Sequence, residues 1–146
     1  LPGMANAVFA RFGSVHRNTF IRAPELLDER LEHRGRPGLH FAGQMAGVEG
    51  YVESAALGLL AGVFVAAKAR SAVAPLPPAT TALGALLRHL REANPRHFQP
   101  MNVNFGLFPP LEGTAARAPR RERNGRIAER ALGALEPWAV AVGAVR

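Results

Sequence analysis

The chain has 146 residues, of which 48% are hydrophobic and 20% are charged, which is enough apolar material for one domain with a core. This composition excludes a disordered tail. The absence of cysteine excludes disulfide bonds, thiolate metal sites and a cysteine nucleophile within this sequence. The formal net charge is +7, and Lys68 is the only lysine. The arginine excess favours a polyanionic partner, although codon usage in a GC-rich genome accounts for part of it.

Neither a targeting segment nor a membrane span is predicted. The start of the sequence lacks a basic segment followed by an apolar stretch, so we expect no signal peptide. The apolar run at residues 55–67 is shorter than the roughly 20 residues that span a bilayer, and Glu53 and Lys68 bound it. We therefore expect a buried core helix, no membrane association and a cytoplasmic protein. The oligomeric state is not predicted.

The first 42 residues predict short extended segments joined by turns. Residues 6–12 alternate well enough for a strand, with Val8 and Phe9 on opposite faces. The polar residues 16–19 follow, and a turn held by their Asn and Thr side chains is the simplest interpretation. Pro24 suits the start of a single helical turn. Residues 28–37 predict a mostly solvated, hairpin-like excursion, and residues 39–42 predict a buried strand.

Three glycines, Gly43, Gly47 and Gly50, separate this strand from a helix predicted over residues 51–70. Glycine lets backbone N–H groups approach a ligand closely, and a helix start offers unpaired donors and a positive dipole end. The segment therefore suits a phosphate or a delocalised anion. Its spacing is not G-x-G-x-x-G, and most glycine turns before helices bind nothing, so the spacing alone is not specific.

The next segment predicts a linker followed by an amphipathic helix. Residues 71–79 are rich in proline and predict an extended linker. Thr80 or Thr81 suits the N-cap of a helix that runs to about Glu92. Four leucines recur at helical spacing and predict its apolar face: Leu83, Leu86, Leu87 and Leu90. His89 and His97 are expected at the surface, and no metal site is predicted.

Residues 98–146 predict an amide-rich loop and a basic helix. The amides of residues 99–106 suit either a base or pterin edge or a tight loop. Three aromatic residues are expected in the core: Phe98, Phe105 and Phe108. In the helix predicted over residues 117–135, three arginines share a face: Arg123, Arg126 and Arg130. This helix is either solvated, with Glu122 paired to Arg126, or a contact for RNA phosphates. Residues 136–146 are expected to form a tail.

Three blocks of sequence together carry a specific resemblance. They are RFGSVHRNTFI at residues 11–21, FAGQMAGVEGYVESAALGLLAG at residues 41–62 and FQPMNVNFGLFPP at residues 98–110. The second block looks like the segment FAGQ-x-x-GVEGYVESAA-x-G-L-x-AG of the folate- and FAD-dependent tRNA (uracil-5-)-methyltransferases, the TrmFO family. The blocks occur in the family's order with similar separations. The resemblance covers nearly the whole chain and fades after about residue 119.

This resemblance implies an α/β fold, the C-terminal part of a two-dinucleotide-binding, glutathione-reductase-like (Rossmann-type) FAD domain. Mainly short strands plus three helices are expected, without the N-terminal Rossmann half. In the family a glycine-rich ADP-binding turn opens the protein, so we expect this chain to be the C-terminal part of a longer enzyme and inactive alone. Residues 1–70 would belong to the FAD-binding domain, 71–79 would be a linker, 80–135 a helical region and 136–146 a tail.

The resemblance also implies a reaction and its residues. The intact protein would methylate C5 of uridine 54 in the T loop of tRNA with 5,10-methylenetetrahydrofolate, and FADH2, regenerated by NAD(P)H, would be the reductant. The family's cysteine nucleophile is not in this chain, so no catalytic residue is expected here. FAD would contact Gly43, Gln44, Gly47, Val48, Glu49, Gly50 and Tyr51, with Glu49 turned away to cap the helix. The folate and substrate pocket would hold His16, Arg17, Asn18, Thr19, Asn102 and Asn104. The tRNA would contact Arg117, Arg120, Arg121, Arg123, Arg126 and Arg130.

Two other functions stay open. The related FAD-dependent protein that builds carboxymethylaminomethyl-uridine at the tRNA wobble position shares the fold and cofactors, but the GVEGYVESAA and FQPMNVNFG blocks argue against it. A non-catalytic basic RNA-binding module would use the charge of +7 alone. Such a module would bind tRNA with a steep salt dependence and would bind no flavin.

Overall fold

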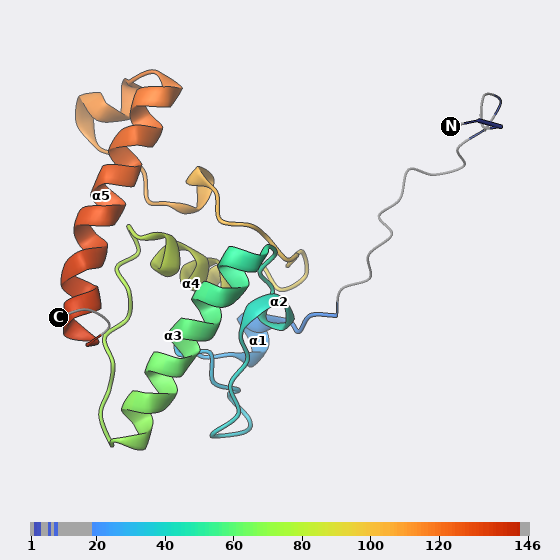
Figure 1. The fold of residues 1–146 in the computed structure, drawn as a ribbon, viewed down its shortest axis with the longest axis vertical. Helices are drawn as coiled ribbons and strands as arrows, with labels where there is room; N and C mark the ends of the chain where they lie inside the picture. The colour runs from blue at the N-terminus through green and yellow to red at the C-terminus, as the bar shows by residue number, and fades with distance from the viewer. Residues whose placement is uncertain (1, 4–5, 7, 9–18, 144–146) are drawn as a thin grey trace.

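Three helices of at least 11 residues dominate the computed structural model, which describes residues 2–3, 6, 8 and 19–143 (Figure 1). α3 (Tyr51–Ala69) contacts α4 (Ala82–Glu92), and α5 (Arg120–Ala141) is the longest helix. The short elements are α1 (Ala23–Leu26), α2 (Gly43–Ala46) and the 3-10 helices η1 (Phe105–Leu107) and η2 (Gly113–Arg117). α1 packs on α4, and α2 packs on α3. Most of the strand predicted at residues 6–12 lies outside the described residues.

The expectation of mainly short strands is wrong for the described part of the chain, whereas the three helices are confirmed. In place of strands, the described residues form three isolated β-bridges. Two are antiparallel, Leu27 with His33 and Glu32 with His40, and one is parallel, Val48 with Met101. The first two close the predicted hairpin, whose tip at residues 34–38 is exposed. Leu31 has a left-handed backbone with φ 62°. This conformation interrupts the extended chain that a longer ladder needs, so the strand predicted at 39–42 makes only one bridge.

The core lies where α3 faces α4. Leu57, Leu60 and Phe64 of α3 are buried in one cluster with Leu86 and Leu87 of α4. The predicted apolar face of α4 is therefore confirmed, because its leucines recur at a helical period and turn inward together.

The helix predicted over residues 51–70 is confirmed, since α3 ends at Ala69. Within the described residues it is the one helix long and apolar enough to cross a bilayer by length and composition. Its inner face, with Leu57 and Leu60, is buried in the core, whereas Leu59 and Val65 are exposed. The inner face is that of a core helix, and the absence of membrane association stays a prediction.

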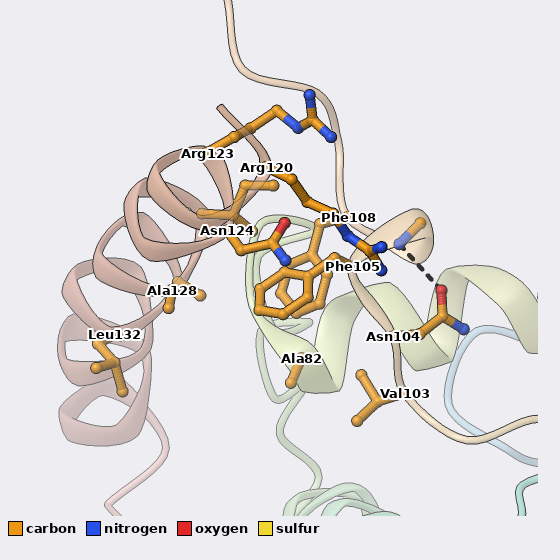
Figure 2. Close-up of a pocket in the computed structure, with 13 residues that line it drawn as sticks. Ala82, Val103, Asn104, Phe105, Phe108, Arg120, Arg123, Asn124, Ala128 and Leu132 are labelled. Carbon is orange, nitrogen blue, oxygen red and sulfur yellow. Dashed lines mark hydrogen bonds between the residues drawn. The ribbon is translucent and has the colours of Figure 1, made fainter. Parts of the chain in front are cut away.

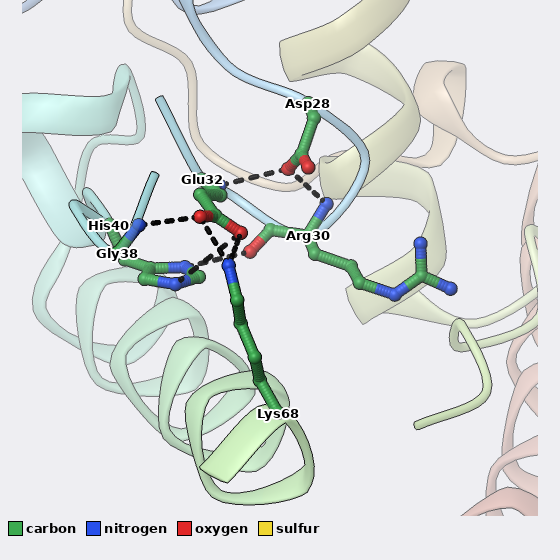
Figure 3. A network of polar contacts seen from close by, with 6 residues as sticks. All are labelled: Asp28, Arg30, Glu32, Gly38, His40 and Lys68. Atoms are coloured by element: carbon green, nitrogen blue, oxygen red, sulfur yellow. Dashed lines mark hydrogen bonds and ion pairs between the residues drawn. The ribbon is translucent and has the colours of Figure 1, made fainter. Parts of the chain in front are cut away.

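An ion pair fixes the hairpin to the C-terminal end of α3 (Figure 3). Lys68 Nζ donates to the two carboxylate oxygens of Glu32 at 2.5 and 2.6 Å, and the Gly38 N–H donates to the same carboxylate at 2.6 Å. These donors, with Lys68 first, hold the pKa of the Glu32 carboxyl below its usual value. Behind the pair, Asp28 Oδ1 accepts from the N–H groups of Arg30 and Glu32 at 2.8 and 2.9 Å. The hairpin is thus held in place by side chains rather than by a sheet.

The proline-rich segment before α4 packs against the core in an extended form. Residues 72–78 contain no helix or strand, and Ala74 is buried. Thr81 is the N-cap of α4, as predicted: its Oγ1 accepts from the Gly84 N–H at 3.0 Å and its hydroxyl donates to the Pro78 carbonyl at 2.7 Å. A Cβ on Gly84 would lie 2.1 Å from that carbonyl oxygen, so the close approach of segment and helix needs glycine.

The basic helix is confirmed, but its predicted bounds are wrong. α5 begins at Arg120 and continues through Pro137 to Ala141, so residues 136–141 are not a tail. Trp138 is 7% exposed, belongs to the core cluster, and its Nε1 donates to the Pro75 carbonyl at 2.9 Å. Burial of this large side chain holds the last turns in place although proline removes a backbone donor.

Candidate functional site

The segment from Gly43 to Tyr51 makes two sharp changes of direction between α2 and α3. Gly43, Gly47 and Gly50 have φ values of 63°, 101° and 87°. Gly47 is the left-handed C-cap of α2, and Gly50 is the N-cap of α3. Side chains disfavour all three conformations, so the glycines set the path of the backbone here.

Two of these glycines also allow close packing. A Cβ on Gly47 would lie 2.3 Å from Cζ of Phe98, which is buried. A Cβ on Gly50 would lie 2.3 Å from Glu53 Oε2 and 2.7 Å from Asn102 Nδ2. The glycine segment therefore sits directly against the segment that begins at Phe98.

The start of α3 is open. No partner among the described residues accepts a hydrogen bond from the backbone N–H groups of Tyr51, Val52 or Glu53, as expected for a helix start without a side-chain cap. Tyr51 and Val52 are 97% and 79% exposed. The prediction that Glu49 caps α3 is wrong: no side chain caps this helix, and Glu49 is exposed. The left-handed turn at Gly50 separates Glu49 from the helix that it was expected to cap.

The amide-rich loop packs against this helix start. The Glu49 N–H donates to the Met101 carbonyl at 3.1 Å, in the parallel bridge between Val48 and Met101. Glu53 Oε1 accepts from the Val103 N–H at 3.2 Å and from Asn102 Nδ2 at 3.4 Å. Glu53, which sequence reasoning did not place in the site, thus joins segments 50 residues apart in the chain.

The residues predicted to contact a cofactor divide into two groups. Gly43, Gly47 and Val48 are buried, and four are exposed: Gln44, Glu49, Gly50 and Tyr51. Asn102 lies at the glycine segment, whereas Asn104 is at the N-cap of η1, where its Oδ1 accepts from the Gly106 N–H at 2.9 Å.

Three of the four residues of the predicted polar cluster, His16, Arg17 and Asn18, lie outside the described residues. Thr19 is described and exposed.

The six arginines predicted to contact RNA lie at η2 and along α5. Arg117 ends η2, and Arg120, Arg121 and Arg126 are exposed on α5. The predicted pair forms, with Arg126 Nη2 2.6 Å from Glu122 Oε1. Arg130 is half-buried and donates to the Pro109 and Pro110 carbonyls, the latter at 3.0 Å. Arg130 therefore holds the preceding loop against α5, and a phosphate contact would have to compete with these bonds.

A pocket of about 810 Å³ lies between η1, the first turn of α4 and the first half of α5 (Figure 2). We call it the η1–α5 pocket; its walls include Phe105, Phe108, Arg120, Arg123, Asn124 and Ile127. The prediction that Phe105 is a core residue is wrong, since it is 45% exposed, and Phe108 is half-buried. Only Phe98 of the three is in the core. The sequence held one signal for this pocket: two phenylalanines three residues apart, flanked by glycine and proline rather than by an apolar pattern.

The prediction that His89 lies at the surface is wrong. Its ring lies 5.6 Å from that of Phe98, and burial lowers its pKa. His97 is exposed, as predicted. Within the described ranges no group of three or more histidine, aspartate or glutamate side chains is placed to hold a metal ion.

Comparison with known proteins relates the chain to one family. A family model described as "Glucose inhibited division protein A" matches residues 1–72. A protein of Syntrophotalea carbinolica is 59% identical over 138 residues, 94% of this chain and 30% of the relative. One of Geobacter sulfurreducens is 54% identical over 97% of this chain and 32% of the relative, and one of Rhodopseudomonas palustris is 51% identical over 94% and 33%. All three are named methylenetetrahydrofolate–tRNA-(uracil-5-)-methyltransferase TrmFO.

This chain belongs to the TrmFO family. It spans 30% to 33% of the length of these three relatives. Membership implies an FAD-binding, Rossmann-like class of fold, so the predicted α/β class is supported at that level. The described residues themselves supply helices and isolated bridges.

Proposed function

We propose that this chain is the C-terminal part of a cytoplasmic flavoenzyme that methylates C5 of uridine 54 in the T loop of tRNA. The carbon donor would be 5,10-methylenetetrahydrofolate, the reductant FADH2, and NAD(P)H would reduce the flavin. The names of the TrmFO relatives support the transfer from folate to tRNA uracil. The structural observation that carries the proposal is the open start of α3, framed by the glycine segment and by residues 101–103.

The open start of α3 fits a flavin. The N–H groups of Tyr51, Val52 and Glu53 are free of partners in the described part of the chain. The Glu53 carboxylate is turned toward the amide-rich loop, where its Oε1 accepts from the Val103 N–H and from Asn102. A bound flavin supplies two-electron reduction, and its reduced form carries negative charge around N1 and the C2 carbonyl. Backbone donors and the positive end of α3 would stabilise that charge.

The remaining site residues keep the roles that the family resemblance implies. His16, Arg17, Asn18 and Thr19 would face the folate, and Asn102 would lie between folate and flavin because it sits on the glycine segment. Asn104 would support Asn102 rather than contact the ligands directly, since its amide is bonded within η1 and to the Asn102 carbonyl. The exposed arginines of η2 and α5 would face the tRNA backbone.

The test is flavin content and methyl transfer in the protein expressed from the complete gene. We expect a yellow protein that transfers a methylene carbon from labelled 5,10-methylenetetrahydrofolate to tRNA, with the label at C5 of uridine 54 by mass spectrometry. Gly50→Ala strains a backbone at φ 87° and places Cβ 2.3 Å from Glu53 Oε2, so flavin affinity should fall at least about tenfold. The control is Gly58→Ala in the middle of α3, where a Cβ meets nothing within 4 Å.

Other outcomes would favour the alternatives. A yellow protein whose tRNA product is modified at the wobble uridine would indicate the carboxymethylaminomethyl pathway instead. A protein without flavin that binds tRNA with a steep salt dependence would be a basic RNA-binding module. Equal flavin affinity in Gly50→Ala and Gly58→Ala would contradict the placement of the flavin at the start of α3.

A further inference from the structure

The η1–α5 pocket presents an aromatic surface to solvent. Phe105 is 45% exposed, and its ring centroid lies 6.0 Å from that of Phe108, with 34° between the ring planes. The two rings lie beside each other at the wall of the pocket, opposite the first turns of α5 (Figure 2). An exposed ring on a pocket wall is a stacking platform for a flat ligand, because stacking keeps contact area without requiring a fixed pattern of hydrogen bonds.

The pocket also offers a polar group that is free to bind. Asn124 lines it, and its side chain makes no hydrogen bond with another described residue and lies toward the two phenylalanine rings (Figure 2). A free amide donates and accepts at once, which suits the edge of a nucleobase. The second amide of the pocket, Asn104, is already bonded to Gly106 and to the Asn102 carbonyl.

The rim of the pocket is positively charged. Arg120 and Arg123 line it, and neither forms an ion pair with a carboxylate in the described residues. The segment from residue 112 to residue 126 holds five arginines against two glutamates, and Glu122 is paired with Arg126. An aromatic platform with a free amide and two arginines at its rim matches a base with its phosphate. An acidic peptide would use the charge but would leave the exposed ring without a partner.

We propose that the η1–α5 pocket binds one unstacked nucleotide from a single-stranded loop of the tRNA substrate. The base stacks on Phe105, the Asn124 amide meets its edge, and Arg120 and Arg123 contact its phosphates. This inference rests on the proposed function, which supplies tRNA as the substrate. Residues 101–108 join the pocket to the glycine segment, since Met101 bridges to Val48 and Phe105 lines the pocket. The pocket therefore anchors the RNA beside the proposed reaction site and does not take part in the chemistry.

The experiment measures binding of tRNA, of a single-stranded RNA oligonucleotide and of duplex RNA by fluorescence anisotropy, with the intact flavin-loaded protein. Phe105→Leu keeps an apolar side chain but removes the ring, and we expect roughly 5- to 150-fold weaker binding of tRNA and single-stranded RNA. Phe105→Trp keeps a stacking surface and should bind as the wild type does. Duplex RNA, which has no unstacked base, should bind these variants equally.

Charge is tested separately through the salt dependence. Arg123→Gln should reduce the slope of log K against log salt for single-stranded RNA by about 0.7, the value for one phosphate contact. The matched control is Arg36→Gln, on the exposed tip of the hairpin, which should leave the slope unchanged. The circular dichroism spectrum of each variant confirms its fold. If Phe105→Leu does not fold, Arg123→Gln decides the question, because an unchanged salt slope overturns the inference.

The outcomes separate this inference from the proposed function. If methyl transfer is found but Phe105→Leu binds tRNA as tightly as the wild type, the pocket is not a nucleotide site and the enzyme assignment stands. If Phe105→Leu weakens duplex and single-stranded RNA equally, the inference is also overturned. If binding of single-stranded RNA depends on Phe105 while no methyl transfer occurs, the pocket assignment stands and the proposed function fails.

Discussion

Gly47→Ala should destabilise the protein strongly, because this position combines a left-handed backbone with contact against a buried ring. Gly47 has φ 101°, and an added Cβ would lie 2.3 Å from Cζ and 2.6 Å from Cε1 of Phe98. Phe98 cannot turn away freely, since it is 4% exposed and packed against the rings of Phe20 and His89. The methyl group therefore forces either the turn or the ring to move.

The magnitude follows from these two costs. A left-handed backbone costs a non-glycine residue about 1–2 kcal/mol, and an extra methyl in a filled core costs about 1–3 kcal/mol. We expect Gly47→Ala to lower the free energy of unfolding by about 2–5 kcal/mol, against a typical total of about 5–15 kcal/mol. Gly58→Ala is the control: it lies in a helix with open space around it and should stabilise the protein by about 0.5–1 kcal/mol.

Urea denaturation, followed by circular dichroism, measures both variants. A double-mutant cycle with Phe98→Leu locates the cause, because leucine lacks the two ring atoms that the new Cβ would meet. Gly47→Ala should cost at least about 1 kcal/mol less in the Phe98→Leu background than in the wild type. If its cost is the same in both backgrounds, or within about 0.5 kcal/mol of zero in the wild type, the packing argument is refuted.

Two further predictions test the contact between the hairpin and α3 and the contact between the end of α5 and the proline-rich segment. The pKa of Glu32 is lowered chiefly by Lys68, so the stability from this pair is complete above the usual pKa of 4.5 and is lost as the pH falls through the folded value. From about pH 7 to pH 3, urea midpoints should therefore fall more steeply for the wild type than for Glu32→Gln, and parallel curves would count against the pair. Trp138→Phe keeps a buried ring but removes the hydrogen bond to the Pro75 carbonyl, so the free energy of unfolding should fall by about 1 kcal/mol. A variant as stable as the wild type would mean that the end of α5 is not anchored.

The helices were predictable because their signals are local. The N-cap at Thr81, the leucines of α4 and the alanine- and leucine-rich run after Gly50 all act within a few turns of the chain. The end of α5 was not predictable locally: a tail was expected after residue 135, but the helix continues through Pro137 to Ala141, where Trp138 is buried. The strand predicted at residues 39–42 did not form, because a strand depends on a partner and not on its own residues alone. The hairpin provides one bridge there.

The site was predictable only in part. The turns at Gly43, Gly47 and Gly50 were predictable because glycine is the residue that adopts backbone conformations that side chains disfavour, whereas their contact with a cofactor stays a prediction. Which of the two carboxylates near the start of α3 contacts the amide-rich loop was not visible, since Glu49 and Glu53 are equally close in sequence to Tyr51. The choice of Glu53 depends on donors that come from Asn102 and Val103, about 50 residues later.

By itself, the sequence determined the helices, the glycine turns and the blocks that relate the chain to the TrmFO family, because all of these are properties of neighbouring residues. The tertiary structure alone decided that the amide-rich loop lies against the glycine segment, that Phe105 faces a pocket and that Trp138 closes the core. Those outcomes depend on which distant surfaces bury each other. Burial is a property of the packed chain as a whole, so no local pattern determines it.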